Sequence, residues 1–308
     1  MLDVLANVRQ LQEVGAKALF RAKRGAIDIL PALIPEHYPG QANEPAMAGS
    51  FTPLRVRPPR LRYLAVNARR APFDDVRVRR AVALILPRDH ISVELAKGLE
   101  RPIAGPIWPG GPGDGAGPEP PPLDLTGAAA LLDDAGWRDL DGDGIRERGP
   151  EKLRLALLVT SDTRGDRERD AIVMALRRAG FVLEVRPGEP GYLLGRLKAG
   201  EFDAAMLEWR SRVDDDVTQL VATGGALNFG GFSAPDVDTA CATLIAAWEP
   251  ELRAAKLGEL ARLMATEAPI LPRTAPDPYG LVHRRVRGMA VWGGWFAIRK
   301  LSLDPSGI

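Results

Sequence analysis

The sequence contains few of the residues from which catalytic and metal centres are usually built. It has one cysteine, Cys241, and three histidines, His37, His90 and His283. A single cysteine excludes an intramolecular disulfide and also a CxxC metal or redox motif. The apolar, helical pattern around Cys241 predicts that its thiol lies in the core. One unpaired thiol is compatible both with the cytosol and with a buried position in the periplasm.

Long hydrophobic runs and an excess of charge of one sign are also absent. No window approaches the about 18 consecutive apolar residues that a membrane span needs. The 41 Lys and Arg residues are balanced by 40 Asp and Glu residues, which excludes a long-range field for nucleic acid or an acidic membrane. We therefore interpret the cluster of Arg77, Arg79 and Arg80 as the solvated face of a helix rather than a phosphate site.

Signals for secretion, nucleotide binding and nucleophilic catalysis are missing as well. The first thirty residues lack an apolar stretch followed by small residues, so the protein is cytosolic or the chain begins downstream of its natural start. No Gly-x-Ser-x-Gly motif or dinucleotide fingerprint occurs. The glycine-rich run 105–122 precedes no Gly-Lys-Ser/Thr, so it is predicted to be a surface loop. We expect a protein that is not an enzyme and that carries no cofactor.

The clearest patterns that are present are those of alternating strands and helices. A helix is predicted over 74–86, with Asp74 or Asp75 as its N-cap and Pro87 as its end. Between residues 126 and 209 the order helix, strand, helix, strand, helix, strand is predicted. The strands lie at 153–159, 181–185 and 202–206, and the helices at 126–135, 166–179 and 192–200. This order predicts an α/β fold with a mostly parallel sheet flanked by helices.

The flanking regions give further expectations. Helices are predicted over 11–24, 89–97, 235–248 and 250–266, a short strand over 26–30, another strand over 61–67 and a surface loop over 31–59. Cys241 and Trp248 are expected to face inward on one of the late helices, and Leu252 on the next. The end of the chain, 269–303, is expected to form short strands.

One carboxylate cluster resembles the first half of a calcium loop. Asp139, Asp141 and Asp143 occupy positions one, three and five, and a glycine occupies position six. Position twelve, where a bidentate Glu is needed, falls on Pro150, and Glu151 misses it by one residue. We therefore predict a tight Asp/Gly turn between a helix and a strand, with no metal site.

A second cluster, Asp214–Asp216, follows the strand that ends near Trp209. Open α/β sheets bind ligands at the carboxyl ends of their strands, so these carboxylates are candidates for ligand contact. They also suit a helix N-terminus, where the macrodipole favours negative charge. An enzyme would use them to hold a metal or as a general base, but no histidine lies nearby. Five aromatic residues are candidates for a pocket, although a core position is favoured for each: Trp209, Phe229, Phe232, Trp292 and Trp295.

Six segments in order resemble the bacterial extracellular solute-binding proteins of family 5, which deliver peptides, nickel and opines to ABC importers. The segments are LAVNARRAPFDDVRVRRAVA (64–83), RPIAGPIWP (101–109), ALLDDAGWRDLDGDGIRER (130–148), EFDAAMLEW (201–209), FGGFSAPDVD (229–238) and ATEAPILPR (265–273). In that family the segment at 130–148 forms a helix followed by an Asp-Gly turn.

The resemblance implies a periplasmic-binding-protein-like lobe and a partial second lobe. Residues 1–60 would be a remnant of lobe I, residues 61–275 lobe II, and residues 276–308 strands that return to lobe I. It implies the C-terminal portion of a longer periplasmic or extracellular protein. This protein would close on a peptide or similar small solute and dock on ABC permease subunits, without binding nucleic acid or spanning the membrane.

The resemblance also suggests ligand-binding residues, namely Trp209, Arg212, Asp214, Asn228 and Phe229. In the peptide-binding members an aspartate beyond the Trp-bearing strand pairs with the free α-amine of the ligand. An ungapped alignment places Arg212 at that position, and a two-residue gap would place Asp214 there. Arginine suits a carboxylate or a phosphate rather than an ammonium group, so we expect an anionic or neutral solute, or loss of peptide binding. The simpler alternative is an exposed Arg212 paired with a neighbouring aspartate.

Two other functions stay open at this point. The chain could be the ligand-sensing domain of a transcriptional regulator, or a metal-dependent enzyme that uses Asp214–Asp216. A helix-turn-helix encoded upstream would favour the regulator, whereas heat on titration with a divalent metal would favour the enzyme.

Overall fold

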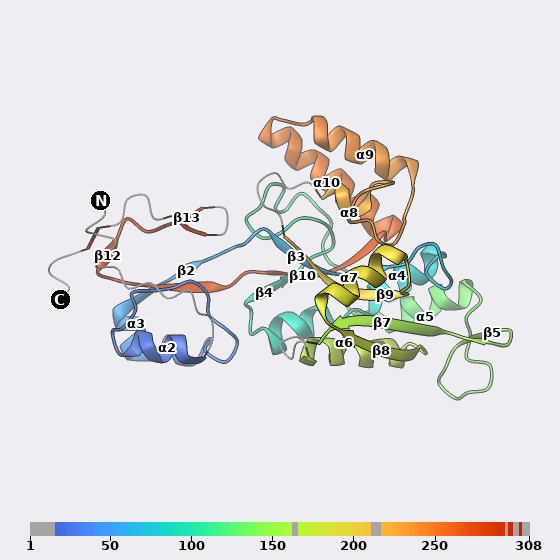
Figure 1. Ribbon diagram of the computed structural model, residues 1–308, viewed down its shortest axis with the longest axis horizontal. Helices are drawn as coiled ribbons and strands as arrows, with labels where there is room; N and C mark the ends of the chain where they lie inside the picture. Colours follow the sequence, from blue (N-terminus) through green and yellow to red (C-terminus); the bar gives the residue numbers. More distant parts are fainter. Residues whose placement is uncertain (1–15, 162–165, 211–216, 293–294, 298–301, 304–308) are drawn as a thin grey trace. The chain divides into compact units, whose positions relative to one another are not determined.

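The computed structural model describes residues 16–161, 166–210, 217–292, 295–297 and 302–303 (Figure 1). The chain forms two compact units. The smaller unit comprises Met1–Pro59, Ser92–Arg101 and Pro276–Ile308, and the larger unit comprises Arg60–Ile91 and Pro102–Ala275. The two are described separately below.

The main sheet has six strands in the order β4-β10-β3-β9-β7-β8. Their bounds are β3 Arg60–Val66, β4 Glu100–Pro102, β7 Arg154–Thr160, β8 Val182–Gly188, β9 Ala204–Arg210 and β10 Ile270–Pro276. Strand β7 pairs in parallel with β8 and β9, as the alternating pattern predicts, because helical crossovers join these three strands. Strand β3 pairs antiparallel with both β9 and β10, so the sheet as a whole is mixed rather than mostly parallel.

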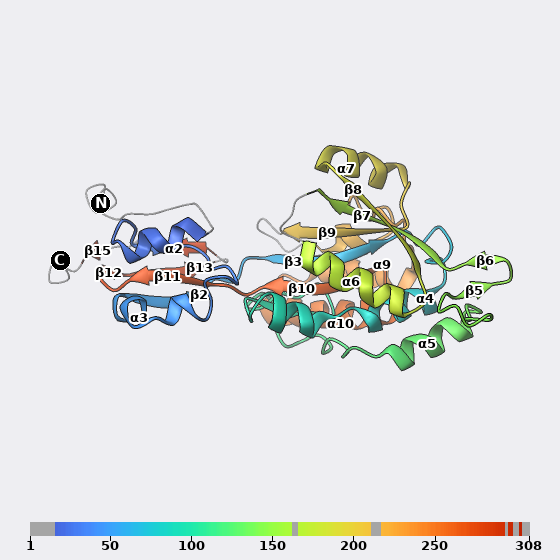
Figure 2. The same ribbon diagram turned by 90° about the horizontal axis from the view of Figure 1, so that it is seen from below.

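Helices cover both faces of this sheet, which confirms the α/β fold (Figures 1 and 2). They are α4 Val76–Ile85, α5 Leu125–Asp134, α6 Asp166–Arg178, α7 Pro190–Ala199, α8 Thr218–Val221, α9 Pro235–Ala246 and α10 Pro250–Glu267. Alternate residues of β3 show which helices lie on which face. Leu61 and Tyr63 belong to the core that includes residues of α7, α8, α9 and α10. Arg62 points to the opposite face, where it pairs with Glu168 of α6.

The ends of the helices follow from their sequence. Asp75 caps α4 by accepting a hydrogen bond from the Arg77 backbone N–H at 2.8 Å, and the side-chain hydrogen bond from Arg77 lowers the pKa of this carboxyl. Asp124 caps α5 by accepting from the Gly127 N–H, also at 2.8 Å. Helix α7 ends at Gly200, whose φ of 68° is left-handed.

Among the three arginines of α4, Arg79 is the one for which the predicted solvated position is wrong. Its residue is only 5% exposed. The guanidinium donates to Glu267 O at 2.8 and 3.1 Å, to Ala268 O at 3.2 Å and to Phe73 O at 2.9 Å. The carbonyls of Glu267 and Ala268 lie at the C-terminal end of α10. No helical N–H is left there to pair with them, and the helix dipole favours a cation. The expected solvated face is therefore wrong for Arg79, because successive helical residues point in different directions.

The smaller unit is built on the three-stranded sheet β1-β11-β2. Its elements are α2 Ala16–Lys23, β1 Ile29–Leu30, the 3-10 helix η1 Gln41–Asn43, α3 Pro45–Ser50, β2 Phe51–Arg55 and β11 Tyr279–His283. The expectation of a surface loop over 31–59 is thus wrong for residues 41–55. Pro45, which suggested a loop, is at the first position of α3. Strand β2 exists because β11, far along the chain, pairs with it antiparallel.

Shorter elements complete the described part of the chain. They are the π-helix η2 His90–Leu95 and the strands β5 Glu147–Arg148, β6 Glu151–Lys152, β12 Val286–Arg287, β13 Ala290–Trp292, β14 Trp295–Ala297 and β15 Ser302–Leu303. The predicted helix over 89–97 is therefore a π-helix. Cys241 is buried, as expected. Trp248 and Leu252 do not face inward, since they are 86% and 48% exposed. Helix α9 ends at Ala246, which leaves Trp248 in the connection to α10.

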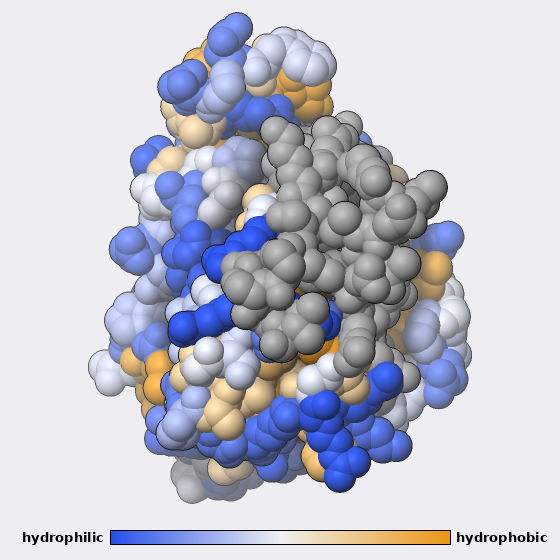
Figure 3. All heavy atoms as spheres, turned by 90° about the vertical axis from the view of Figure 1, so that its left-hand side faces the viewer, coloured by the Kyte–Doolittle hydropathy of each residue, from blue (hydrophilic) through white to orange (hydrophobic). Residues whose placement is uncertain are grey.

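Among the described residues, no helix combines the length and the apolar character that crossing a bilayer requires. Hydrophilic and hydrophobic side chains are interspersed on the face shown in Figure 3, outside its grey atoms.

Candidate functional site

Charged side chains gather on one face of the main sheet, at the end where β9 finishes. In the antiparallel register of β3 and β9, Arg60 lies opposite Arg210 and Arg62 lies opposite Glu208. Glu208 pairs with Arg210 at 2.6 Å, with Arg62 at 3.4 Å and with Arg60 at 3.7 Å. Three arginines therefore converge on one carboxylate.

A second carboxylate extends this group across the sheet. Glu168, in the first turn of α6, forms an ion pair with Arg273 of β10 and lies 3.8 Å from Arg62. The side chain of Arg273 is only 3% exposed. These ion pairs thus connect β3, β9, β10 and α6. We call this group the arginine cluster, and its members are Arg60, Arg62, Arg210, Arg273, Glu168 and Glu208.

Burial and ion pairing shift the pKa values of two groups in the arginine cluster. Burial alone would raise the pKa of Glu208, but the hydrogen bond from Arg210 and the nearby positive charges lower it below its usual value. Burial, together with the repulsion from Arg210, lowers the pKa of Arg60. Among the described residues, four guanidinium groups form ion pairs with the carboxylates of Glu168 and Glu208. The side chain of Arg210 is 63% exposed, so its fork can reach a dissolved carboxylate or phosphate.

Trp209 lies between Glu208 and Arg210 but points to the opposite face of the sheet. It is 8% exposed and belongs to the core that faces helices α7 to α10. Its ring centroid lies 6.0 Å from that of Trp108, which is part of the glycine-rich region before α5. Its packing fixes the end of β9, and so the position of Arg210, through the backbone.

Asn228 and Phe229 lie in a loop attached to the other end of β3. The Asn228 amide donates to Ala222 O at 2.9 Å and to Phe232 O at 2.8 Å, and it accepts from the Phe232 N–H. Ala68 N–H donates to Gly230 O at 3.0 Å, which holds this loop beyond the end of β3. This point is about 20 Å along the strand from the partner of Trp209. The structure thus does not bring this loop to the arginine cluster.

The remaining candidates are placed only in part. Arg212 and the aspartates Asp214–Asp216 lie outside the described residues. Phe232 is buried in the core of the larger unit. Trp292 and Trp295 are opposite one another in the backbone register of the β13–β14 hairpin.

Sequence reasoning missed the arginine cluster, although part of its signal is visible. Arg60 and Arg62 alternate at the start of the strand predicted over 61–67, and Glu208 and Arg210 alternate just beyond the strand predicted over 202–206. Such alternation places each pair on one face of its strand. What the sequence does not show is the antiparallel register that superimposes the two pairs, because residues about 150 positions apart meet there.

Comparison with known proteins places the chain in a family. Residues 12–231 match the model of the bacterial extracellular solute-binding proteins, family 5 Middle. The chain belongs to this family. The curated Protein XP55 of Streptomyces lividans is 27% identical over 203 aligned residues, and the match covers 63% of this chain and 36% of that protein.

Solved structures agree with the family 5 fold. The oligopeptide-binding protein AppA from Bacillus subtilis, in complex with a nonapeptide, matches with a TM-score of 0.72 and 16% identity. NikA from Brucella suis, in complex with Fe(III)-EDTA, matches with a TM-score of 0.75 and 19% identity. The matches cover 94% of this chain, but only 58% of AppA and 60% of NikA. At these identities the likeness shows the fold alone, and the chain spans less than two thirds of each of these proteins.

Proposed function

We propose that this chain is part of the solute-binding component of an ABC importer. It would act without catalysis, outside the cytoplasmic membrane, and would pass its solute to permease subunits. Family membership supports this role. The observation that carries the proposal is the arginine cluster at the carboxyl end of β9, since open α/β sheets bind their ligands at such strand ends.

The charge of the cluster suggests which solutes fit. An exposed Arg210 beside Arg60 and Arg62 offers N–H donors in a planar fork, which matches a carboxylate or a phosphate better than an ammonium group. The sequence places another arginine, Arg212, two residues further along. We therefore propose a peptide or similar small solute that is held through an anionic group, not through a free α-amine.

A calorimetric screen of the 308-residue chain tests this proposal. The probes are a small dicarboxylate, a phosphorylated small molecule, an unmodified tripeptide and the same tripeptide with its N-terminus acetylated. We expect the anionic probes to bind, and acetylation to leave the affinity of the tripeptide unchanged. Arg210→Ala should weaken the binding of anions about 10- to 100-fold, because a charge-assisted hydrogen bond contributes about 1.5–3 kcal/mol.

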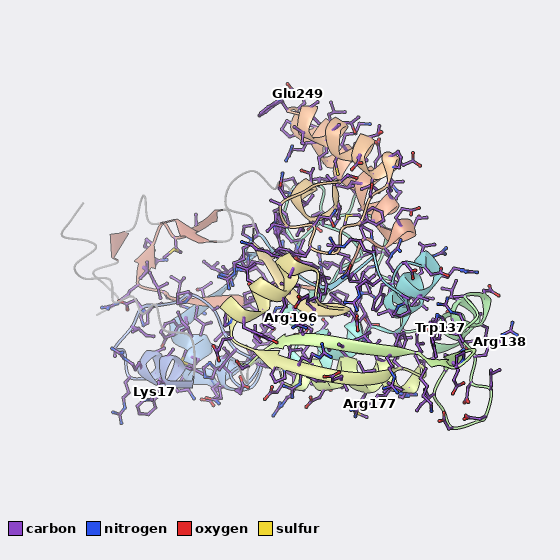
Figure 4. The ribbon with its side chains drawn as sticks, turned by 45° about the vertical axis from the view of Figure 1, so that its right-hand side comes forward. Lys17, Trp137, Arg138, Arg177, Arg196 and Glu249 are labelled. Atoms are coloured by element: carbon purple, nitrogen blue, oxygen red, sulfur yellow. The ribbon has the colours of Figure 1, made fainter. Side chains whose placement is uncertain are left out.

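Three variants decide which residues take part. Arg212→Ala should also weaken the binding of anions, whereas Arg177→Ala, an exposed arginine on α6, should leave it unchanged (Figure 4). Asp214→Ala should have no effect on the acetylated tripeptide. If unmodified peptides bind tightly, acetylated ones do not, and only Asp214→Ala abolishes binding, the proposed anion recognition is wrong.

A further inference from the structure

Three carboxylates meet in the loop that connects α5 to the β5–β6 hairpin. One possible ligand atom from each of Asp139, Asp141 and Glu147 lies within 4.8 Å of the other two. The loop lies at the end of the larger unit that Figure 1 marks with β5, and Figure 4 shows Trp137 and Arg138 in the same region. Compared with a calcium loop, this segment lacks a carboxylate at position twelve, where Pro150 stands. The structure instead brings in Glu147, at position nine.

Glu147 differs from an ordinary surface carboxylate. Its residue is only 9% exposed, and paired backbone hydrogen bonds with Arg138, at 2.7 and 2.9 Å, hold it in place. Its Oε2 accepts from the Leu140 N–H at 3.2 Å. Its Oε1 is buried and has no hydrogen-bond partner among the residues that the structure describes. A buried carboxylate oxygen without a partner is costly, and two further carboxylates close to it increase the cost by repulsion.

We propose that Asp139, Asp141 and Glu147 bind a calcium ion. A bound cation provides the buried Oε1 with a partner and removes the repulsion among the three carboxylates. All three ligands are hard oxygens, the type that calcium prefers. Two oxygens that lie about 2.3–2.6 Å from one calcium ion are at most about 5 Å apart, so three oxygens within 4.8 Å of one another are close to the arrangement that a single ion requires.

The loop holds these oxygens in place without using up their capacity to bind an ion. Asp139 accepts from the Gly142 N–H at 2.8 Å and from the Gly144 N–H at 3.0 Å, one bond on each oxygen. Each carboxylate oxygen retains a further lone pair. Asp143 is engaged otherwise, because Lys152 pairs with its Oδ2 at 2.9 Å.

The position of the loop indicates a structural role for the ion. The loop precedes β7, whereas the arginine cluster lies at the carboxyl end of β9, which runs parallel to β7. The two sites are therefore at opposite ends of these parallel strands. Calcium should stabilise the connection between α5 and β7 without contacting the solute, so this proposal can fail or succeed independently of the proposed transport function.

The test uses the 308-residue chain, first treated with a chelator and then titrated with calcium. We expect a dissociation constant of about 10⁻⁴–10⁻³ M, as in extracellular calcium modules. At about 10 mM calcium the melting temperature should rise by about 3–8 °C. Terbium, a luminescent substitute for calcium, should show emission excited through Trp137, which is next to Arg138, the backbone partner of Glu147.

Matched variants distinguish a specific site from general attraction to a negative loop. Glu147→Gln keeps the shape of the side chain, and Asp141→Asn changes an exposed residue, so at least one should fold. Each should weaken calcium and terbium binding about 10- to 100-fold. Glu151→Gln removes the same charge from the same hairpin and should bind as the wild type does. Wild-type protein without a calcium response, or unchanged affinity in both Glu147→Gln and Asp141→Asn, would overturn the proposal.

Discussion

Replacing Arg79 with alanine is expected to lower the free energy of unfolding by about 3–5 kcal/mol. The substitution removes a buried guanidinium and leaves the carbonyls of Phe73, Glu267 and Ala268 without this donor. It also leaves a cavity between α4 and the end of α10. The effect should appear as a lower midpoint in urea unfolding monitored by tryptophan fluorescence.

Two variants of α4 make this test specific. Arg80 is the next residue along and is exposed, so Arg80→Ala should change stability by no more than about 0.5 kcal/mol. Arg79→Lys retains the charge but loses the planar fork, so it should fall between the alanine variant and the wild type. Equal losses of unfolding free energy for Arg79→Ala and Arg80→Ala would show that the hydrogen bonds of Arg79 do not hold α4 to the end of α10.

Local patterns were sufficient to predict most helices and the parallel part of the sheet. Each of α5, α6, α7, β7, β8 and β9 lies within a few residues of its predicted range. The residues that cap or end the helices are local to them. Apolar residues recur at the helical period in the helices and alternate in the strands. The alternation of strands and helices predicts parallel pairing through crossovers, which the β7–β8 and β7–β9 pairs confirm, whereas the strand order β9-β7-β8 differs from the order along the chain.

Features that depend on distant pairing could not be predicted in this way. Strand β2 was interpreted as loop because its partner β11 lies more than 220 residues away in sequence. Arg79 was assigned to a solvated face because its carbonyl partners belong to α10. In both cases the stabilising partner is outside any local window, so tertiary contacts override the local preference.

The candidate sites also depend on backbone pairing that a local sequence pattern does not show. The arginine cluster needs the register between β3 and β9, and the carboxylate triad of the loop needs the backbone bridge between Arg138 and Glu147. The sequence predicts candidate ligand residues after β9 and a turn in the Asp-Gly segment. It could not show that Arg210 meets Arg60, or that position nine rather than position twelve completes the triad.

Leu155 provides the strongest test of the βαβαβ core, since it sits in β7 directly opposite Leu183 of β8. It is 1% exposed, so Leu155→Ala should cost about 2–5 kcal/mol through lost burial and the cavity that remains. The matched control is Leu252→Ala in the first turn of α10, where the same chemical change occurs at a residue that is 48% exposed. That variant should stay within about 0.5 kcal/mol of the wild type.

Both variants are measured by urea unfolding of the 308-residue chain, with the slope compared to ensure that the unfolded state is unchanged. A loss below about 0.5 kcal/mol for Leu155→Ala would contradict the placement of β7 in the centre of this core, because a fully enclosed leucine cannot lose three carbons without leaving either a void or a rearranged sheet.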